Sequence, residues 1–329
     1  MRAARAKRVN ASKLSSSVLE LIGNTPIVRL KKMVSKGHAR IFVKPEFMNP
    51  SGSIKDRMVL YAIEAAEERG ELKKGATIVE ATSGNTGVAL SMIAAIKGYR
   101  AIIVMPDTTS KEKIKIMEAF GSKLVFTSAK KGMNAPVEKA RSIARKKKLF
   151  LLNQFENPDN VESQVITGKE ILRQVKKVDA FVAGIGTGGT LIGVAKALKN
   201  KNPRTKIVAL EPTVVPSFYN LFYKKNLKVA KGIAHEIEGI GEGFVPKILI
   251  DNIHLVDDVM LVKDKDAIEM TNRLAEEEGL FVGVSSGANV WAALKLAKKI
   301  GRRKNVVTVL PDTGQRYLSN DVFKNGGKK

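Results

Sequence analysis

The chain has 329 residues, of which 44% are hydrophobic, and this length favours two globular domains over one. No apolar run reaches the roughly 18 residues that a membrane-spanning helix needs, so we expect no membrane-embedded segment and no membrane partner. The sequence contains no cysteine and three histidines. It therefore excludes disulfides, thiolate nucleophiles and cysteine-zinc sites, leaves little for histidine chemistry, and predicts no metal site.

The formal net charge of +25 is typical of nucleic-acid-binding proteins, so this class has to be considered. The lysines and arginines, however, occur in short runs such as residues 144–148 and 301–304, mostly at expected helix ends, where cations complement the helix dipole. The chain has one tryptophan, and no basic stripe alternates with aromatic residues. We therefore expect a solvated basic surface and no nucleic-acid partner, with a non-catalytic binding module as the alternative.

Residues 1–16 are basic, contain serine and lack acidic residues. This composition is typical of an organelle transit peptide and equally of a loose terminal arm. We expect a basic N-terminal arm on a cytoplasmic protein, with organelle targeting as the alternative.

Apolar, β-rich runs alternate with helical patterns along the chain. The first set has strands at residues 39–46, 76–81, 99–106, 123–127 and 149–153, and helices at 56–69, 85–97, 110–120 and 132–147. The second set has strands at residues 179–185, 206–212 and 305–312, and helices at 159–175, 189–199, 265–278 and 286–299. This alternation predicts an α/β protein with two doubly wound, three-layer (αβα) domains and mostly parallel sheets.

A polar segment with Pro158, near residues 153–160, marks the expected domain boundary. We assign residues 49–157 to a smaller domain, and residues 17–48 together with 158–329 to a larger one.

In such sheets, ligands bind where strands end and helices begin. The loop "GIGTGGT", Gly184 to Thr190, follows an expected strand and opens a helix, so its backbone N–H groups predict a phosphate site. The same loop fits G-x-G-x-x-G, and Glu211 ends the next expected strand, so a nicotinamide-dependent oxidoreductase is an alternative. No G-K-[ST] follows, which excludes an ATP-binding P-loop.

The loop "ATSGNTG", Ala81 to Gly87, has the same strand-to-helix setting. Its backbone N–H groups and its Ser83, Asn85 and Thr86 side chains suit a carboxylate. An ordinary helix N-cap explains the same residues, and both interpretations stay open here.

The segment "GVSSG", Gly283 to Gly287, fits the G-x-S-x-G pattern of serine hydrolases. That chemistry needs a histidine after the serine, and no histidine follows His254. We therefore interpret Ser285 as a hydroxyl that faces a ligand or caps a helix.

Lys55, in "NPSGSIKDR", lies where a helix is expected to begin near Asp56. The positive end of the helix dipole and burial would both lower the pKa of its amine. A solvated lysine is the ordinary interpretation, but a neutral lysine amine forms Schiff bases. Pyridoxal phosphate needs such a lysine for its aldehyde and an anion site for its phosphate, which the 184–190 loop offers.

Six motifs together carry a resemblance to a known family: "NPSGSIKDR", "EATSGNTG", "GIGTGGT", "EIEGIGEGF", "GVSSGAN" and "DTGQRYLS". In this order the chain resembles the cysteine synthases (O-acetylserine sulfhydrylases) and the related cystathionine β-synthases from about residue 17 to 319. These are pyridoxal-phosphate enzymes of fold type II. The resemblance therefore implies pyridoxal 5′-phosphate as the cofactor.

The resemblance also implies roles for individual residues. Lys55 would hold the cofactor as an internal aldimine and then shuttle the α-proton of the substrate. Asn85 would contact the cofactor's 3-hydroxyl and Ser285 its ring nitrogen. The phosphate would be bound by Gly186, Thr187, Gly188, Gly189 and Thr190. The amino-acid substrate would be bound by Thr82, Ser83, Gly84, Asn85, Thr86, Gln154 and Gly239.

The implied reaction is β-replacement in cysteine biosynthesis, a lyase or transferase activity. O-acetylserine would lose acetate, sulfide would add to the resulting aminoacrylate, and L-cysteine would be released. O-phosphoserine as substrate is an alternative that Arg316 and other basic residues keep open, and homocysteine as nucleophile would give a short cystathionine β-synthase. Family members are homodimers, and some bind the C-terminal tail of serine acetyltransferase.

Overall fold

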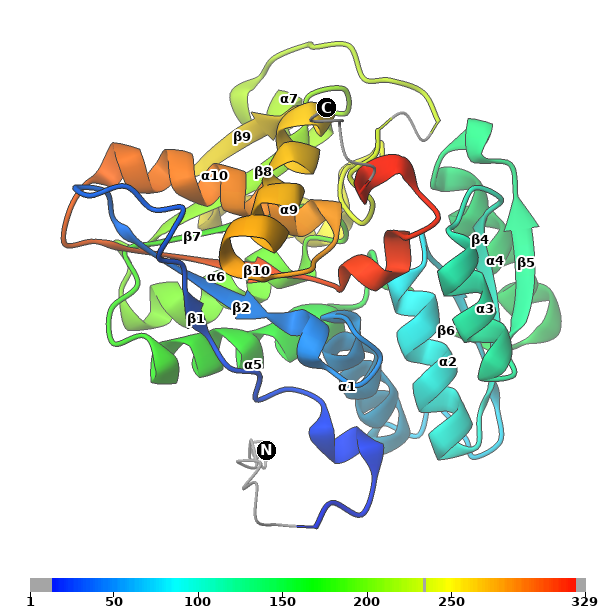
Figure 1. Cartoon of the computed structure of the whole chain (residues 1–329). Helices are drawn as coiled ribbons and strands as arrows, with labels where there is room; N and C mark the ends of the chain where they lie inside the picture. Colours follow the sequence, from blue (N-terminus) through cyan, green and yellow to red (C-terminus); the bar gives the residue numbers. More distant parts are fainter. Residues whose placement is uncertain (1–13, 233–234, 324–329) are drawn as a thin grey trace.

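The computed structural model describes residues 14–232 and 235–323, so the expected N-terminal arm lies almost entirely outside the described residues. Two β-sheets lie beside each other, with the smaller one at the right of Figure 1. No helix within these described ranges is both long and apolar enough to cross a membrane.

The larger sheet has six strands, and only its first pair is antiparallel. In spatial order the strands are β1 (Val28–Arg29), β2 (Arg40–Pro45), β10 (Asn305–Leu310), β7 (Ala180–Gly184), β8 (Lys206–Pro212) and β9 (Asp258–Val262). The smaller sheet has four parallel strands, in the order β5 (Lys123–Thr127), β4 (Arg100–Pro106), β3 (Thr77–Ala81) and β6 (Phe150–Leu151).

Helices connect the parallel strands and cover both faces of each sheet. They are α1 (Lys55–Glu68), α2 (Asn85–Lys97), α3 (Lys111–Ala119), α4 (Asn134–Lys147), α5 (Pro158–Gln174), α6 (Gly189–Lys201), α7 (Ser217–Tyr223), α8 (Lys247–Asp251), α9 (Asp264–Glu278) and α10 (Val284–Ile300). Because successive strand side chains point to opposite faces, a strand covered on both faces is apolar along its whole length. The sequence shows this in β7, β8 and β10, which are almost entirely buried.

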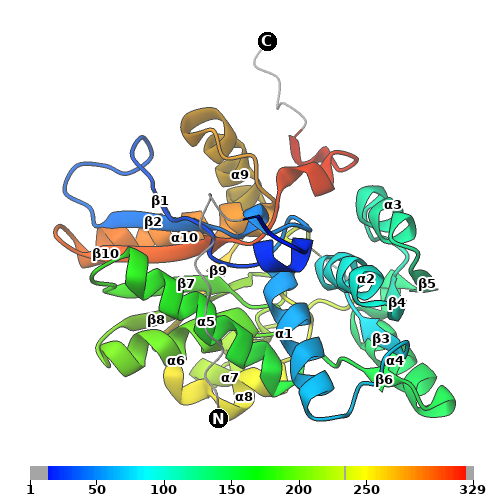
Figure 2. The ribbon, with the colours of Figure 1, turned by 90° about the horizontal axis from the view of Figure 1, so that it is seen from below.

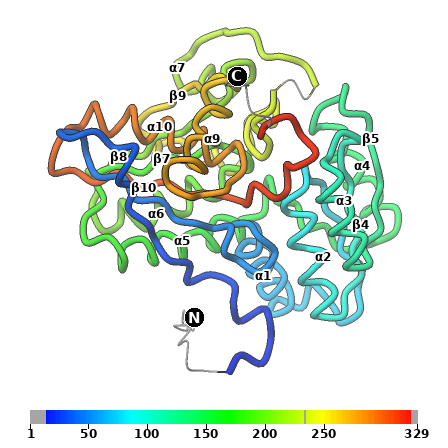
Figure 3. Tube along the Cα trace, viewed as in Figure 1, coloured from blue at the N-terminus to red at the C-terminus, as the bar shows by residue number. Residues whose placement is uncertain are grey.

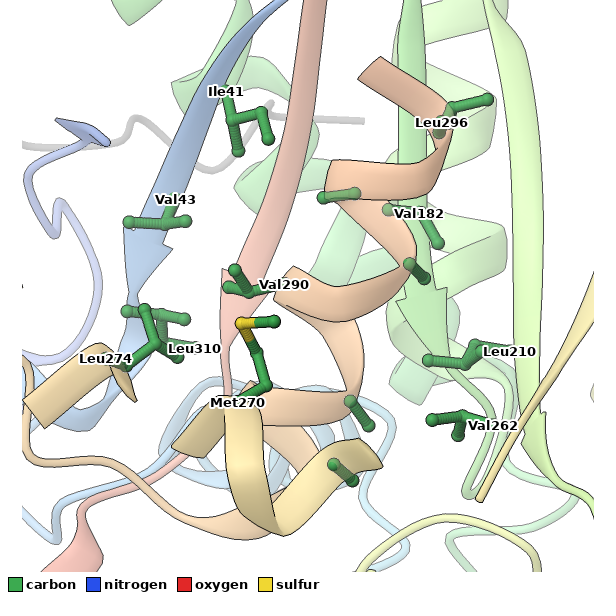
Figure 4. Packing of buried hydrophobic residues seen from close by; sticks show 14 of the residues in the cluster. Ile41, Val43, Val182, Leu210, Val262, Met270, Leu274, Val290, Leu296 and Leu310 are labelled. Atoms are coloured by element: carbon green, nitrogen blue, oxygen red, sulfur yellow. The ribbon is translucent and has the colours of Figure 1, made fainter. Parts of the chain in front are cut away.

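Strand β7 illustrates this packing. Val182 belongs to the cluster formed with α9 and α10, whereas Phe181 belongs to the cluster formed with α5 and α6. Figure 4 shows side chains of the first cluster, among them Ile41 of β2 and Val290 of α10. The larger sheet is therefore the middle layer of three.

The smaller sheet is built in the same way. Ile78 of β3 packs in the cluster that contains side chains of α1 and α2, and Val79 packs in the cluster that contains side chains of α4. Helix α1 lies between α2 and α5 and contacts both, as Figure 2 shows. Helix α1 therefore connects the smaller sheet and its helices (the smaller unit) with the larger sheet and its helices (the larger unit). The candidate site begins at this connection.

The predicted fold class is confirmed, and most predicted elements lie within two residues of their observed bounds. The strands β1 and β9 and the short helices α7 and α8 were not predicted. All strands of the smaller sheet come from residues 77–151, and those of the larger sheet come from residues on either side of that range. The domain boundaries themselves stay a prediction.

Candidate functional site

Four helices begin at the junction between the two sheets, and their first residues carry most of the predicted site. Lys55 begins α1, Asn85 begins α2, Gly189 begins α6, and Ser285 is the second residue of α10. Two small pockets, of about 20 and 40 Å³, lie between these helix starts, and Lys55 and Asn85 line both of them.

The Lys55 side chain lies among buried polar groups. Burial lowers the pKa of its amine below the usual range, while the carboxylates of Glu242 and Asp312 act in the opposite direction. Helix α1 has no side-chain N-cap hydrogen bond and begins at Lys55 itself, one residue before the predicted start. This setting favours a neutral amine, which is the nucleophilic form.

Glu242 faces Lys55 and was not among the predicted site residues. Burial raises the pKa of its carboxyl to about 7, against the lowering effect of Lys55. It lies within the motif "EIEGIGEGF", which was used for the resemblance without a role for this residue. The sequence motif alone gave no signal that its carboxylate approaches residue 55.

A buried ion-pair network holds the first turn of α1. Arg57 donates to Glu46 at 2.6 Å and to Glu170 at 2.8 Å. Burial alone would raise the pKa of Glu170, but Arg57 and then Lys44 hold it at about 2. Because removal of one partner leaves an uncompensated buried charge, the network fixes the helix turn that carries Lys55.

The loop before α2 presents backbone donors. Gly84 has a φ of 141°, and its N–H donates to Thr82 Oγ1 at 2.9 Å. The first backbone bond of the helix runs from Val88 N to Gly84 O at 3.0 Å, so the N–H groups of the first turn have no partner within the helix. The first turn also contains no acidic residue, and the loop is therefore open to an anion.

Side chains reinforce this loop. Thr86 Oγ1 donates to Gln154 Oε1 at 2.7 Å, and Gln154 Nε2 donates to the Ala81 carbonyl at 2.6 Å. Asn160 Nδ2 donates both to the Gln154 carbonyl at 2.8 Å and to Thr187 Oγ1 at 2.9 Å. Asn160 thus connects the α2 loop with the α6 loop, a contact that the sequence analysis missed.

Asn85 is oriented by the segment that follows β10. Its Nδ2 donates to Asp312 Oδ2 at 2.7 Å, and Arg316 donates to its Oδ1. Tyr317 donates to the same Asp312 oxygen at 2.5 Å. Figure 3 shows this C-terminal segment, in red, running from the larger unit toward α2 and α3.

The glycine-rich loop before α6 is shaped by close backbone packing. A Cβ on Gly186 would lie 2.3 Å from the Gly239 carbonyl oxygen, and one on Gly189 would lie 2.0 Å from Asn160 Oδ1. Gly188 has a φ of 84°. The first backbone bond of α6 runs from Ile192 N to Gly188 O, so the preceding N–H groups of the helix have no partner within it. These features fit a phosphate.

The predicted residues come together in the structure. Eight of them line the pocket of about 20 Å³: Lys55, Thr82, Ser83, Asn85, Thr86, Gln154, Thr187 and Gly239. The pocket of about 40 Å³ adds Gly186, Gly188, Thr190 and Ser285. Gly84 and Gly189 supply the turns that precede or begin the helices. The individual roles stay predictions.

A larger outer cavity of about 450 Å³ adjoins these pockets, and Gly239 and Glu242 line it as well. Its acidic lining residues are Glu236, Glu238, Glu242 and Asp321. No lysine or arginine occurs among the described residues that line it, although the whole chain carries a net charge of +25.

Glu211 does not serve the dinucleotide alternative. Its buried carboxylate accepts the backbone N–H groups of Phe218 at 3.0 Å and Tyr219 at 2.8 Å. It therefore caps the start of α7, and both of its oxygens are engaged there.

Comparison with known proteins gives a consistent result. The family described as "Pyridoxal-phosphate dependent enzyme" matches residues 18–312. A cysteine synthase of Staphylococcus aureus is 43% identical over 316 residues, which are 95% of this chain and 98% of that protein.

Solved structures agree. An O-ureido-L-serine synthase is 40% identical with a TM-score of 0.88, covering 96% of this chain and 98% of that one. A cysteine synthase (OASS) from Entamoeba histolytica is 39% identical with a TM-score of 0.88, covering 97% and 94%. These similarities agree with a site that combines a lysine amine with a glycine-rich loop suited to phosphate. The chain belongs to the cysteine synthase family of pyridoxal-phosphate dependent enzymes, and pyridoxal 5′-phosphate is its cofactor.

Proposed function

We propose that the protein forms L-cysteine from O-acetylserine and sulfide by β-replacement. The observation that carries this proposal is the position of Lys55, whose side chain lines both the pocket at the α2 loop and the pocket at the α6 loop. An amine between two anion-binding loops suits a cofactor phosphate on one side and a substrate carboxylate on the other. Similarity to cysteine synthases supports the choice of reaction.

The residues divide the work as follows. When bound, the cofactor supplies an electron sink that stabilises negative charge at the α-carbon of the substrate. The backbone N–H groups of residues 186–190 would hold its phosphate, and the Lys55 amine would hold its aldehyde carbon. With its Nζ free, the Lys55 amine would take the α-proton of the substrate and later return it. Its lowered pKa keeps a share of this amine neutral.

Ser285 and Asn85 tune the site. Ser285 lines the same pocket as Gly186. From the family resemblance, we assign its hydroxyl to the ring nitrogen of the cofactor. A hydroxyl, unlike a carboxylate, does not hold a proton on that nitrogen, so it favours elimination over transamination. Asn85 is fixed by Asp312 and Arg316 and can offer its second amide hydrogen to the cofactor.

Substrate binding at residues 82–86 also excludes water. A carboxylate bound by the first-turn N–H groups of α2 would draw the smaller unit toward the larger one. Closure of this kind shields a reactive intermediate from hydrolysis.

The outer cavity supports acetate over phosphate as the leaving group. Its acidic residues oppose the approach of a dianionic phosphate ester, whereas an acetyl ester is uncharged. Arg316 is 2% exposed and binds Asn85 and the Ser51 carbonyl, so it is not free for a substrate phosphate. The cavity volume of about 450 Å³ exceeds what sulfide needs, and this favours homocysteine as a second candidate nucleophile.

A homodimer, a cytoplasmic location and binding of a serine acetyltransferase tail stay predictions from the family resemblance. The acidic lining of the outer cavity would oppose the terminal carboxylate of such a tail. Size-exclusion chromatography with light scattering tests the dimer, and calorimetry with a synthetic tail peptide tests the binding.

Turnover with a panel of substrates tests the proposed reaction. The purified holoenzyme is given O-acetylserine, O-phosphoserine or serine, each with sulfide and with homocysteine, and the products are quantified. The largest kcat/KM is expected for O-acetylserine with sulfide. A larger value for O-phosphoserine, or no cysteine from any combination, would contradict the proposal.

A further inference from the structure

A partly buried ion pair joins the smaller unit to the larger one beside the pocket of about 20 Å³. Lys113 belongs to α3 of the smaller unit, and its ammonium bonds to the carboxylate of Glu238, which precedes Gly239 in the larger unit. The Lys113 side chain is 1% exposed, and its Nζ lies 4.4 Å from the centroid of the Tyr317 ring. None of the predicted roles uses this pair.

The Lys113 side chain lies directly on the proposed substrate-carboxylate loop. A Cβ built on Gly84 would lie 2.4 Å from Cδ of Lys113 and 3.5 Å from its Nζ. Lys113 also lines the pocket of about 20 Å³ together with Thr82 and Thr86. A cation is therefore held beside the N–H groups that begin α2.

The two partners differ in how easily each could be left alone. Lys113 is fixed on a helix and shielded from water, so an unpaired ammonium there would be costly. Glu238 is 23% exposed, lines the outer cavity and lies in a loop where Gly239, Gly241 and Gly243 have positive φ. Its carboxylate can therefore return to water. In the paired state Asn320 Nδ2 already donates to its other oxygen at 3.4 Å.

We propose that Lys113 is a substrate-binding residue whose ammonium exchanges the Glu238 carboxylate for the α-carboxylate of the incoming amino acid. The exchange keeps the buried ammonium paired in both states and adds a charged partner to the neutral donors of the 82–86 loop. It deepens the proposed function, and it rests on that function only for the presence of an amino-acid substrate at this site.

The exchange makes a prediction that a merely structural ion pair does not. Removing the Lys113 charge takes away a partner of the substrate carboxylate, whereas removing the Glu238 charge takes away its competitor. The two substitutions should therefore change substrate affinity in opposite directions. If the pair only braced the two units, loss of either partner would have the same sign.

Calorimetric titration of the holoenzyme with L-alanine, which has no β leaving group, tests this exchange. Lys113→Gln should raise the Kd about 10-fold, as expected for loss of a hydrogen bond to a charged group. Glu238→Gln should lower the Kd about 3-fold, given the typical strength of a partly exposed ion pair. Lys113→Arg keeps the charge but not the compact ammonium, so its Kd should lie between those of the wild type and of Lys113→Gln. L-alaninol, which lacks the carboxylate, should show neither change.

Two matched variants separate the exchange from general electrostatics. Glu236→Gln removes one negative charge from the same exposed loop, and Lys115→Gln removes one positive charge from the exposed face of α3. Both should leave the Kd of L-alanine within about 2-fold, because L-alanine carries no net charge for the cavity to repel and neither side chain belongs to the pair. Thermal melting and the absorbance of the bound cofactor verify that each variant is folded and loaded.

An increase in Kd from both Lys113→Gln and Glu238→Gln would overturn the exchange in favour of a brace. An equal decrease from Glu236→Gln and Glu238→Gln would overturn it in favour of bulk charge. If Lys113→Gln does not fold, the Kd values of Glu238→Gln and Glu236→Gln for L-alanine still distinguish the exchange from a brace and from bulk charge. Failure of the proposed reaction would appear separately, as absence of cysteine formation by the wild type.

Discussion

The starts of α2 and α6 are built in different ways, although residues of both loops line the same two small pockets. The α6 loop is shaped by backbone contact, with glycines whose Cβ atoms would strike Gly239 or Asn160 at 2.0–2.3 Å. The α2 loop relies on side chains, among them Thr86 and Gln154, and has the Lys113–Glu238 pair beside it. A rigid backbone cradle suits a ligand that stays, whereas side chains with an exchangeable partner suit one that enters and leaves.

Lys55 serves both loops, and its loss should have the largest effect. Lys55→Ala removes the amine that we propose holds the cofactor and transfers the α-proton, so kcat for cysteine formation should fall by about 10³-fold or more. Stopped-time assays with O-acetylserine and sulfide measure it, with Lys115→Ala on exposed α3 as the control. Normal turnover by Lys55→Ala would remove the basis for treating the two loops as one site.

Gly189→Ala should affect the cofactor and spare the amino acid. The new Cβ would lie 2.0 Å from Asn160 Oδ1, and overpacking of this kind typically costs about 1–3 kcal/mol. We expect cofactor affinity to fall about 10- to 100-fold, measured by cofactor absorbance after dialysis. Gly98→Ala, which strains a backbone with a φ of 75° but places its Cβ in open space, is the control for destabilisation away from the site. Full retention of the cofactor by Gly189→Ala would argue against the α6 cradle.

Gly84→Ala should show the reverse pattern. Its Cβ would press on Lys113 at 2.4 Å, and the φ of 141° strains any side chain. We expect KM for O-acetylserine to rise about 10-fold, because the free-energy cost of such backbone strain corresponds to a change of about that size. The cofactor should stay bound. Steady-state kinetics on enzyme saturated with cofactor measure this. If Gly84→Ala loses cofactor as readily as Gly189→Ala, the two loops do not divide the ligands.

The smallest effect on turnover is expected at Glu80, just below the α2 loop. Burial raises the pKa of its carboxyl to about 8, against the effect of backbone N–H groups including that of Gln154. Because the folded-state pKa lies above the unfolded one, Glu80 contributes its full stability below about pH 4.5 and loses it as pH rises through 8.

Urea unfolding at pH 5 and pH 9 measures this contribution. The Glu80→Gln variant, which carries no ionisable group there, should gain on the order of 2–4 kcal/mol relative to the wild type between the two pH values. Its kcat at pH 7 should change less than about 3-fold, because Glu80 lines neither of the two small pockets. An unchanged difference in unfolding free energy would show that the carboxyl is not protonated in the folded protein.

The fold could be predicted from the sequence wherever the signals are local. Buried parallel strands such as β7 and β10 read as continuous apolar runs, and the glycine-rich loops stand out by composition. Strand β9 was missed because it lies at the sheet edge, where only Val259 and Val262 are buried and no clear period appears.

Parts of the site could not be read from sequence because they depend on distant contacts. Lys113 and Glu238 are 125 positions apart, and Asn85 and Asp312 are 227 apart. Lysines and glutamates of this kind occur throughout a chain of this charge, and nothing local distinguishes a buried pair from a solvated one. The pairs become visible only when the two sheets are placed beside each other.

Borohydride reduction of the holoenzyme, followed by digestion and mass spectrometry, tests most directly whether Lys55 holds the cofactor. The reduced cofactor should be attached to the peptide that contains Lys55. Attachment to any other lysine, or no covalent attachment at all, would contradict it.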